Sequence, residues 1–270
     1  MRINLTQNCI VNKNTFVPFT ENELAQEQRV KDENKLKRAV FLTSTLGMST
    51  ALAIASKKQG FSLNPLKIFK ESPKNWAIFK IKPTPDGRKP LELKEKEILG
   101  LAAGSILGGL AGGAIYDKKN IKAKLRESLN QFLGTVTVPL AFVAGTSRIY
   151  NKHKDKITSK IPVFKNSSGS KILKGTNTFI KGLPAITLTF ASLGVGIIAG
   201  NKVSNFINEK IYHKKIDRGI KPTDFAPHID DLCLASSLMA DGNLFGNVVS
   251  RLIPPALIIA GCETGKAKED

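Results

Sequence analysis

The sequence predicts a mainly α-helical membrane bundle of about four spans, because its charges avoid four long windows. The chain has 270 residues, of which 41 are Lys or Arg and 22 are Asp or Glu, giving a net charge of +19. Between Arg38 and Lys57 lie 18 uncharged residues, between Glu97 and Asp117 lie 19, and two further windows hold 20 each. A helix needs about 20 residues to cross the roughly 30 Å hydrocarbon core of a bilayer. Each window is therefore long enough for one membrane-spanning helix.

The four windows contain spans of unequal quality. The first holds six Ser or Thr residues, whose hydroxyls can bond back to the helix backbone and are tolerated in lipid. The third has a short apolar stretch, 132–145, which contains Pro139, so a buried helix and a kinked span both remain open. The expected spans are 39–56, 98–116, 130–147 and 183–200.

A stripe of glycines in the second span predicts close helix packing. Gly100, Gly104, Gly108 and Gly112 recur every four residues and so share one helix face. In water each glycine would weaken a helix by about 0.5–1 kcal/mol relative to Ala, whereas in lipid bare backbone lets a second helix approach. The pattern resembles the glycine-zipper stripes of many membrane proteins. It favours packing within this chain, with self-association into a homo-oligomer as the alternative.

The segment 118–133 between the second and third spans predicts a basic amphipathic helix. Apolar residues such as Leu125 and Leu129 lie on one side, and Lys118, Lys122, Lys124 and Arg126 take the other. We expect such a helix to lie on an anionic surface, or to cover the protein's own core with its charges in solvent.

A fifth apolar segment, 244–262, is a doubtful span. It carries Arg251 near its middle and then Pro254 and Pro255, and a mid-bilayer Arg costs about 2.5–3.5 kcal/mol on insertion scales. An interfacial or re-entrant piece packed on the bundle is the favoured interpretation. A functional intramembrane Arg is the alternative.

The remaining chain is polar and divides the protein into three parts. Residues 1–38 are a polar arm with a helical stretch around 21–38, residues 39–262 form the membrane domain, and 263–270 are a polar tail. Within the membrane domain, the alternation in 76–93 predicts a short β-hairpin.

Catalytic and cofactor motifs are missing from the sequence. It contains no phosphate-binding loop, dinucleotide fingerprint, HExxH motif or CxxC pair, so we expect no enzyme activity, cofactor or metal. The one polar cluster worth naming is His228, Asp230 and Asp231. Either aspartate is a good cap for the helix that would follow, and this interpretation is favoured over metal binding or proton transfer.

The basic charge is spread over all the polar connections rather than gathered in one recognition element. Attraction to anionic lipid head groups explains this distribution better than nucleic acid does, so we expect the lipid bilayer as partner and a location in a membrane. The leading function class is a structural or interaction protein of the membrane. A small pore or transporter-like bundle, a membrane enzyme built on His228, and a soluble or peripheral helical protein are the alternatives.

Overall fold

The computed structural model is a helical bundle. The described residues are 9–12, 15–18, 21–73, 76–77, 90–164, 171–213, 215–229 and 250–269. Four helices are long and apolar enough to cross a membrane, which confirms the predicted helical class and number of candidate spans. These helices are Glu23–Lys58, Glu95–Tyr116, Lys118–Thr158 and Ile172–Tyr212.

Six helices carry the architecture, and a π-helical segment joins two of them. They are α1 (Glu21–Lys58), α3 (Glu95–Tyr116), α4 (Ile121–Leu129), the π-helical segment Asn130–Thr137, α5 (Val138–Thr158), α6 (Lys171–Tyr212) and α10 (Ile253–Lys266). The shorter elements are β1 (Cys9–Asn12), β2 (Thr15–Pro18), α2 (Pro65–Lys70) and 3-10 turns at Lys118–Asn120, Pro222–His228 and Ser250–Leu252.

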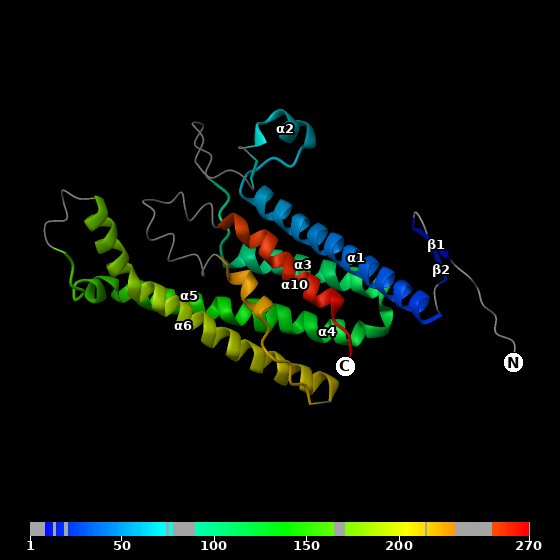
Figure 1. Cartoon of the computed structure of the whole chain (residues 1–270). Coiled ribbons are helices and arrows are strands. Elements are labelled where there is room, and N and C mark those ends of the chain that lie inside the picture. The colour runs from blue at the N-terminus through cyan, green and yellow to red at the C-terminus, as the bar shows by residue number, and fades with distance from the viewer. Residues whose placement is uncertain are drawn as a thin grey trace.

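The helices form two groups that lie side by side (Figure 1). One group packs α1, α3 and α10 together, the other packs α5 and the π-helical segment against α6, and α4 contacts both groups. The turn after Tyr116 lies at the same end of the bundle as the last turns of α6 and α10, because α4 contacts both. We call this the Tyr116 end, and the opposite end, where α3 begins, the Glu95 end.

Three glycines of the predicted stripe face α1. A Cβ built on Gly104 would lie 2.5 Å from the carbonyl oxygen of Gly47, and one on Gly108 would overlap the carbonyl of Thr43. At Gly112 it would overlap the Thr43 hydroxyl. Glycine is therefore needed at these positions because α1 and α3 touch through their backbones.

The opposite side of α3 is equally bare and faces α10. A Cβ on Gly109 would overlap the carbonyl oxygen of Gly261, and one on Gly113 would overlap that of Gly265. Gly100, the first member of the predicted stripe, has no atom within 4 Å of its built Cβ. The helix α3 is thus held between two neighbours of the same chain.

In the second group, helix backbones again come into close contact at glycines. A Cβ on Gly200 of α6 would overlap the carbonyl of Gly134, and one on Gly196 would lie 2.7 Å from Cα of Pro139. Pro139 does not end the helix: the π-helical segment precedes it, and the chain stays helical from α4 to the end of α5. For this window, where a buried helix and a kinked span were both open, the structure has a candidate span, Lys118–Thr158, whose irregular turn lies before the proline.

At Lys124 and Leu125, α4 reverses the expected orientation, whereas Lys118 and Lys122 are exposed as expected. Lys124 is fully buried and Glu127 is 8% exposed, whereas Leu125 is 41% exposed. The expectation that the charged side of 118–133 faces solvent is therefore wrong for Lys124. The polar side of α4 packs inside the bundle because partners for its charges are there, and an apolar residue faces outward.

Three threonine hydroxyls of α1 bond to the backbone of the same helix, as the sequence predicts. Thr43 and Thr50 each donate to the carbonyl four residues before at 2.9 Å, and Thr45 does so at 2.7 Å. The helix is continuous through residues 38 and 39, so the expected boundary between arm and membrane domain falls within one element. The hairpin of β1 and β2 within the arm has no counterpart in the expectations.

Two further expectations concern the connections. Residues 78–89 of the hairpin predicted in 76–93 lie outside the described residues, and the described flanks 76–77 and 90–93 hold no strand, so that hairpin is not supported. In the doubtful fifth segment, Pro254 and Pro255 occupy the first turn of α10, where a missing N–H costs nothing. Arg251 precedes that helix and donates to the Leu91 carbonyl at 3.0 Å, a position that argues against a charge in the middle of a span.

We predict that Gly104→Leu or Gly108→Leu destabilises the bundle, because each side chain would meet the α1 backbone. Overpacking of this kind costs about 1–3 kcal/mol or more, and the thermal unfolding midpoint in detergent should fall. Gly100→Leu is the matched control, since the space around Gly100 is open. Equal midpoints for all three variants would contradict the packing.

Candidate functional site

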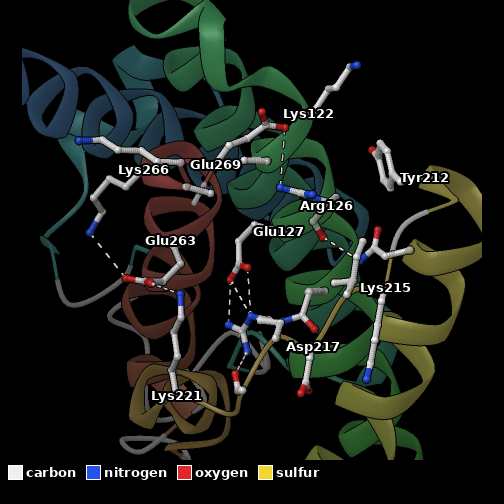
Figure 2. Close-up of a pocket in the computed structure, with 18 of the residues that line it drawn as sticks. Lys122, Arg126, Glu127, Tyr212, Lys215, Asp217, Lys221, Glu263, Lys266 and Glu269 are labelled. Carbon is white, nitrogen blue, oxygen red and sulfur yellow. Dashed lines mark hydrogen bonds and ion pairs between the residues drawn. The ribbon is translucent and has the colours of Figure 1, made fainter.

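A polar groove opens at the Tyr116 end of the bundle (Figure 2). Its volume is about 910 Å³, and its walls come from α1, α4, the end of α6, the connection 215–221 and the end of α10 with its tail. Eight Lys or Arg and five Asp or Glu side chains line it, with Tyr212 among them. The groove is therefore the place where charge gathers between the helices.

Arg218 is the anchor of the groove. Its guanidinium donates to Glu127 from Nε at 3.0 Å and from Nη2 at 2.8 Å, and to Asp224 from Nη1 at 2.7 Å and from Nη2 at 2.8 Å. The flat guanidinium thus bonds one carboxylate on each edge, a geometry that Lys cannot match. This pairing fastens the connection after α6 to α4.

The backbone around Arg218 is held as firmly as its side chain. Its carbonyl accepts from the side-chain amides of Asn201 at 2.7 Å and Asn205 at 3.2 Å, both on α6. Asp224 also accepts from the Lys221 amide at 2.8 Å. The connection therefore follows one path along α6, although it contains no long helix.

The charges of this anchor stabilise one another against the cost of burial. Burial alone would raise the pKa of Asp224, but the hydrogen bonds from Arg218 and the Lys221 amide, together with the charges of both residues, hold that pKa below its usual value. Burial alone would lower the pKa of Arg218, and the bonds to Asp224 and Glu127 raise it instead. Arg218 and Asp224 are both ionised near neutral pH because each charge has a partner.

Arg126 lies on the opposite wall, over an aromatic ring. Its guanidinium carbon is 5.9 Å from the ring centre of Tyr212, and its carbonyl accepts from Asn208 at 3.2 Å. Its one ion pair within the described chain is with Glu269 of the tail, at 3.8 Å. Lys122, one turn earlier on α4, and Lys215 form no ion pair with any described residue.

Lys124 fastens the tail to the turn between α3 and α4. Its ammonium donates to Asp117 at 3.0 Å and to the Ala267 carbonyl at 2.8 Å. Burial would raise the pKa of Asp117, but the hydrogen bonds from Asn120 and Lys124 lower it below the usual value. The Glu269 amide also donates to Asn120 at 3.0 Å, so the tail is held at two points.

His228 has a structural role in the described chain. It is 3% exposed, and its Nε2 donates to the Thr135 carbonyl at 2.8 Å. In a regular helix the amide of Pro139 would serve that carbonyl, but proline has no N–H, and the imidazole supplies a donor instead. Asp230 and Asp231, the other members of the polar cluster, lie outside the described residues.

The residues that were expected to form a site therefore have other places in the structure. Gly104, Gly108 and Gly112 of the stripe are packing positions, and no group of three metal-ligating side chains occurs among the described residues. The anchor of Glu127, Arg218 and Asp224 was missed, because its members lie 91 and 6 residues apart and match no motif. One signal was present: Glu127 is the last charge before the third window, on a side of the helix rich in polar residues.

Comparison with known proteins adds no assignment: no protein-family model, no curated protein and no solved structure matches the chain.

We predict that Asp224→Asn lowers stability above about pH 4 and matters progressively less in acid. The folded pKa of Asp224 is below its unfolded value, near 3.9, so the stability from its charge is complete above the unfolded pKa and is lost as pH falls through the folded one. At neutral pH the loss should be about 1.5–3 kcal/mol, a magnitude typical of hydrogen bonds to charged groups. Unfolding midpoints against pH measure it.

Asp217→Asn is the matched control, because Asp217 lines the same groove, is exposed and forms no ion pair with a described residue. A variant at Asp224 whose deficit is independent of pH would argue against an ionised anchor.

A second prediction concerns the donor that His228 provides. His228→Ala should destabilise the protein by about 1–3 kcal/mol, because a buried carbonyl loses a partner. In a Pro139→Ala background the new amide can serve Thr135, so the same change should cost less. A double-mutant cycle measures this coupling. Additive effects of the two changes would contradict the idea that the His228 imidazole replaces the amide donor that Pro139 lacks.

Proposed function

We propose that the chain is an integral membrane protein with a structural or interaction role rather than a catalytic one. The observation that carries the proposal is the exposure of apolar side chains on the candidate spans. Within the most apolar window of each span, between 28% and 39% of the residues are buried. Leu46 is 68% exposed, Leu107 63% and Ile115 73%. Apolar surface of this extent is unfavourable in water and favourable in hydrocarbon.

The reversed orientation of α4 supports the same proposal. A helix on a water-soluble core buries its apolar side, whereas α4 buries Lys124 and Glu127 and exposes Leu125. Charged side chains near the ends of membrane helices face the bundle interior and pair there. Lys124 follows this pattern through Asp117, and Glu127 follows it through Arg218.

A structural role is favoured over a pore by what lies between α5 and α6. Val143, Leu193 and Ile197 form a buried apolar cluster that Phe225 contacts. Toward the Tyr116 end, α6 contributes Asn208 and Tyr212 to the groove, and a second cavity of about 440 Å³ lies between α5 and α6 toward the Glu95 end. The apolar layer between them favours a bundle closed to ions.

Membrane integration is tested by alkaline carbonate extraction of membranes that contain the protein. We expect the chain to stay in the pellet because its spans are held by burial in hydrocarbon rather than by charge. Recovery in the supernatant would exclude an integral protein and favour the peripheral alternative.

The antiparallel arrangement of the spans makes a separate prediction about sidedness. In a chain whose three cysteines are changed to serine, single cysteines at Lys119 and Lys210 should lie on one side of the membrane. Cysteines at Lys67 and Lys160 should lie on the other side, since these residues flank the Glu95 end of their helices. In sealed vesicles a membrane-impermeant maleimide should label one pair only, and labelling that divides the residues differently would contradict four crossings.

A further inference from the structure

We propose that the groove at the Tyr116 end binds a phosphate-bearing anion, which in a membrane is the head group of an acidic phospholipid. The site is the wall formed by Lys122, Arg126 and Lys215 around Tyr212. The inference rests on the proposed membrane integration, since that brings a lipid head group to this level, and it adds a ligand class to it.

The charge balance of the groove is the first argument. Three of its carboxylates are already neutralised by close partners: Glu127 bonds Arg218, Glu33 bonds Lys37 and Glu263 lies near Lys221 and Lys266. Of the cations on the Tyr212 wall, Lys122 and Lys215 form no ion pair within the described chain, and Arg126 has Glu269 at 3.8 Å. An added anion therefore meets positive charge that the protein itself leaves largely uncompensated.

The geometry of Arg126 is the second argument. The ring of Tyr212 and the bond from Asn208 to its backbone hold it in place, and its side chain is 22% exposed. A held guanidinium keeps several parallel N–H donors, which match two oxygens of a phosphate. Tyr212 adds an aromatic side chain of the kind that gathers at the head-group level of membranes.

The tail supplies the third argument, because it already places an anion at this wall. The Glu269 carboxylate lies 3.8 Å from Nη2 of Arg126 and is 47% exposed. An exposed ion pair at this distance contributes little to stability, so a phosphate at Arg126 displaces it, with Lys122 and Lys215 adding positive charge on either side. Glu269 thus occupies the position of the ligand and competes with it.

The level of the groove is the fourth argument. Its walls include residues that lie outside the charge-free windows: Lys37 before the first, Lys122 after the second and Tyr212 after the fourth. The apolar surfaces of α1, α3 and α6 end at this level. A lipid whose chains lie along these helices has its phosphate beside the groove.

The test uses the full chain in detergent, stripped of lipid. Native mass spectrometry counts bound phosphatidylglycerol and, separately, bound phosphatidylcholine, and thermal unfolding with sodium phosphate measures binding of the free anion. Lys122→Ala with Lys215→Ala is the groove variant, and both residues are exposed, so the fold is kept. Arg29→Ala with Lys31→Ala is the matched control, because it removes two exposed cations of α1 outside the groove.

We expect phosphatidylglycerol to bind in preference to phosphatidylcholine. Compared with the unchanged protein, the groove variant should bind phosphatidylglycerol about tenfold more weakly, and the control variant should bind it equally well. Glu269→Gln should tighten binding because the competing carboxylate is gone. Inorganic phosphate could instead stabilise the protein but not the groove variant, while the two lipids bind equally well. That outcome would retain the site and make its ligand a soluble phosphate ester. Equal affinity of the groove and control variants, or no binding of any probe, overturns the site. Carbonate extraction tests membrane integration independently, so the two failures are distinguishable.

Discussion

The contact of the α3 backbone with the backbones of α1 and α10 is the constraint on which the rest of the structure depends. Successive positions on a helix differ by about 100° in direction, so glycines at 104 and 108 face one way while those at 109 and 113 face another. The first pair meets α1 and the second meets α10. Because both neighbours lie at backbone distance, α1, α3 and α10 form one unit. Because α10 belongs to this unit, the tail that follows α10 lies at the turn between α3 and α4.

Charges join the two helix groups at the Tyr116 end, and elsewhere Val136 of the π-helical segment packs in one apolar cluster with Leu101 and Leu257. Lys124 bonds the tail, and Arg218 joins the connection after α6 to Glu127 of α4. A buried charge is costly unless it is paired and hydrogen-bonded, so each of these groups requires the others. The same arrangement leaves Arg126 and two lysines facing a groove. A structural interaction and a candidate binding surface thus arise from one distribution of charge.

Much of the fold was predictable because the charge-free windows are long and their boundaries are marked by charged residues. The glycine spacing also predicted that α3 would be closely packed, although it could not say which helices pack there. The register of α10 against Gly109 and Gly113 depends on residues about 150 positions away. The anchor at Arg218 was equally hidden, because no local pattern connects it with Glu127.

By itself, the sequence determined which segments are helical and long enough for a membrane, since length, charge and spacing are local properties. The tertiary structure decided which way each side of a helix faces. The pattern around Lys124 and Leu125 shows two unlike sides, but a periodic pattern is the same whether its polar side meets water or the bundle interior. Only the positions of Asp117, Ala267 and Arg218 resolve this, because they supply the partners that make burial of the polar side favourable.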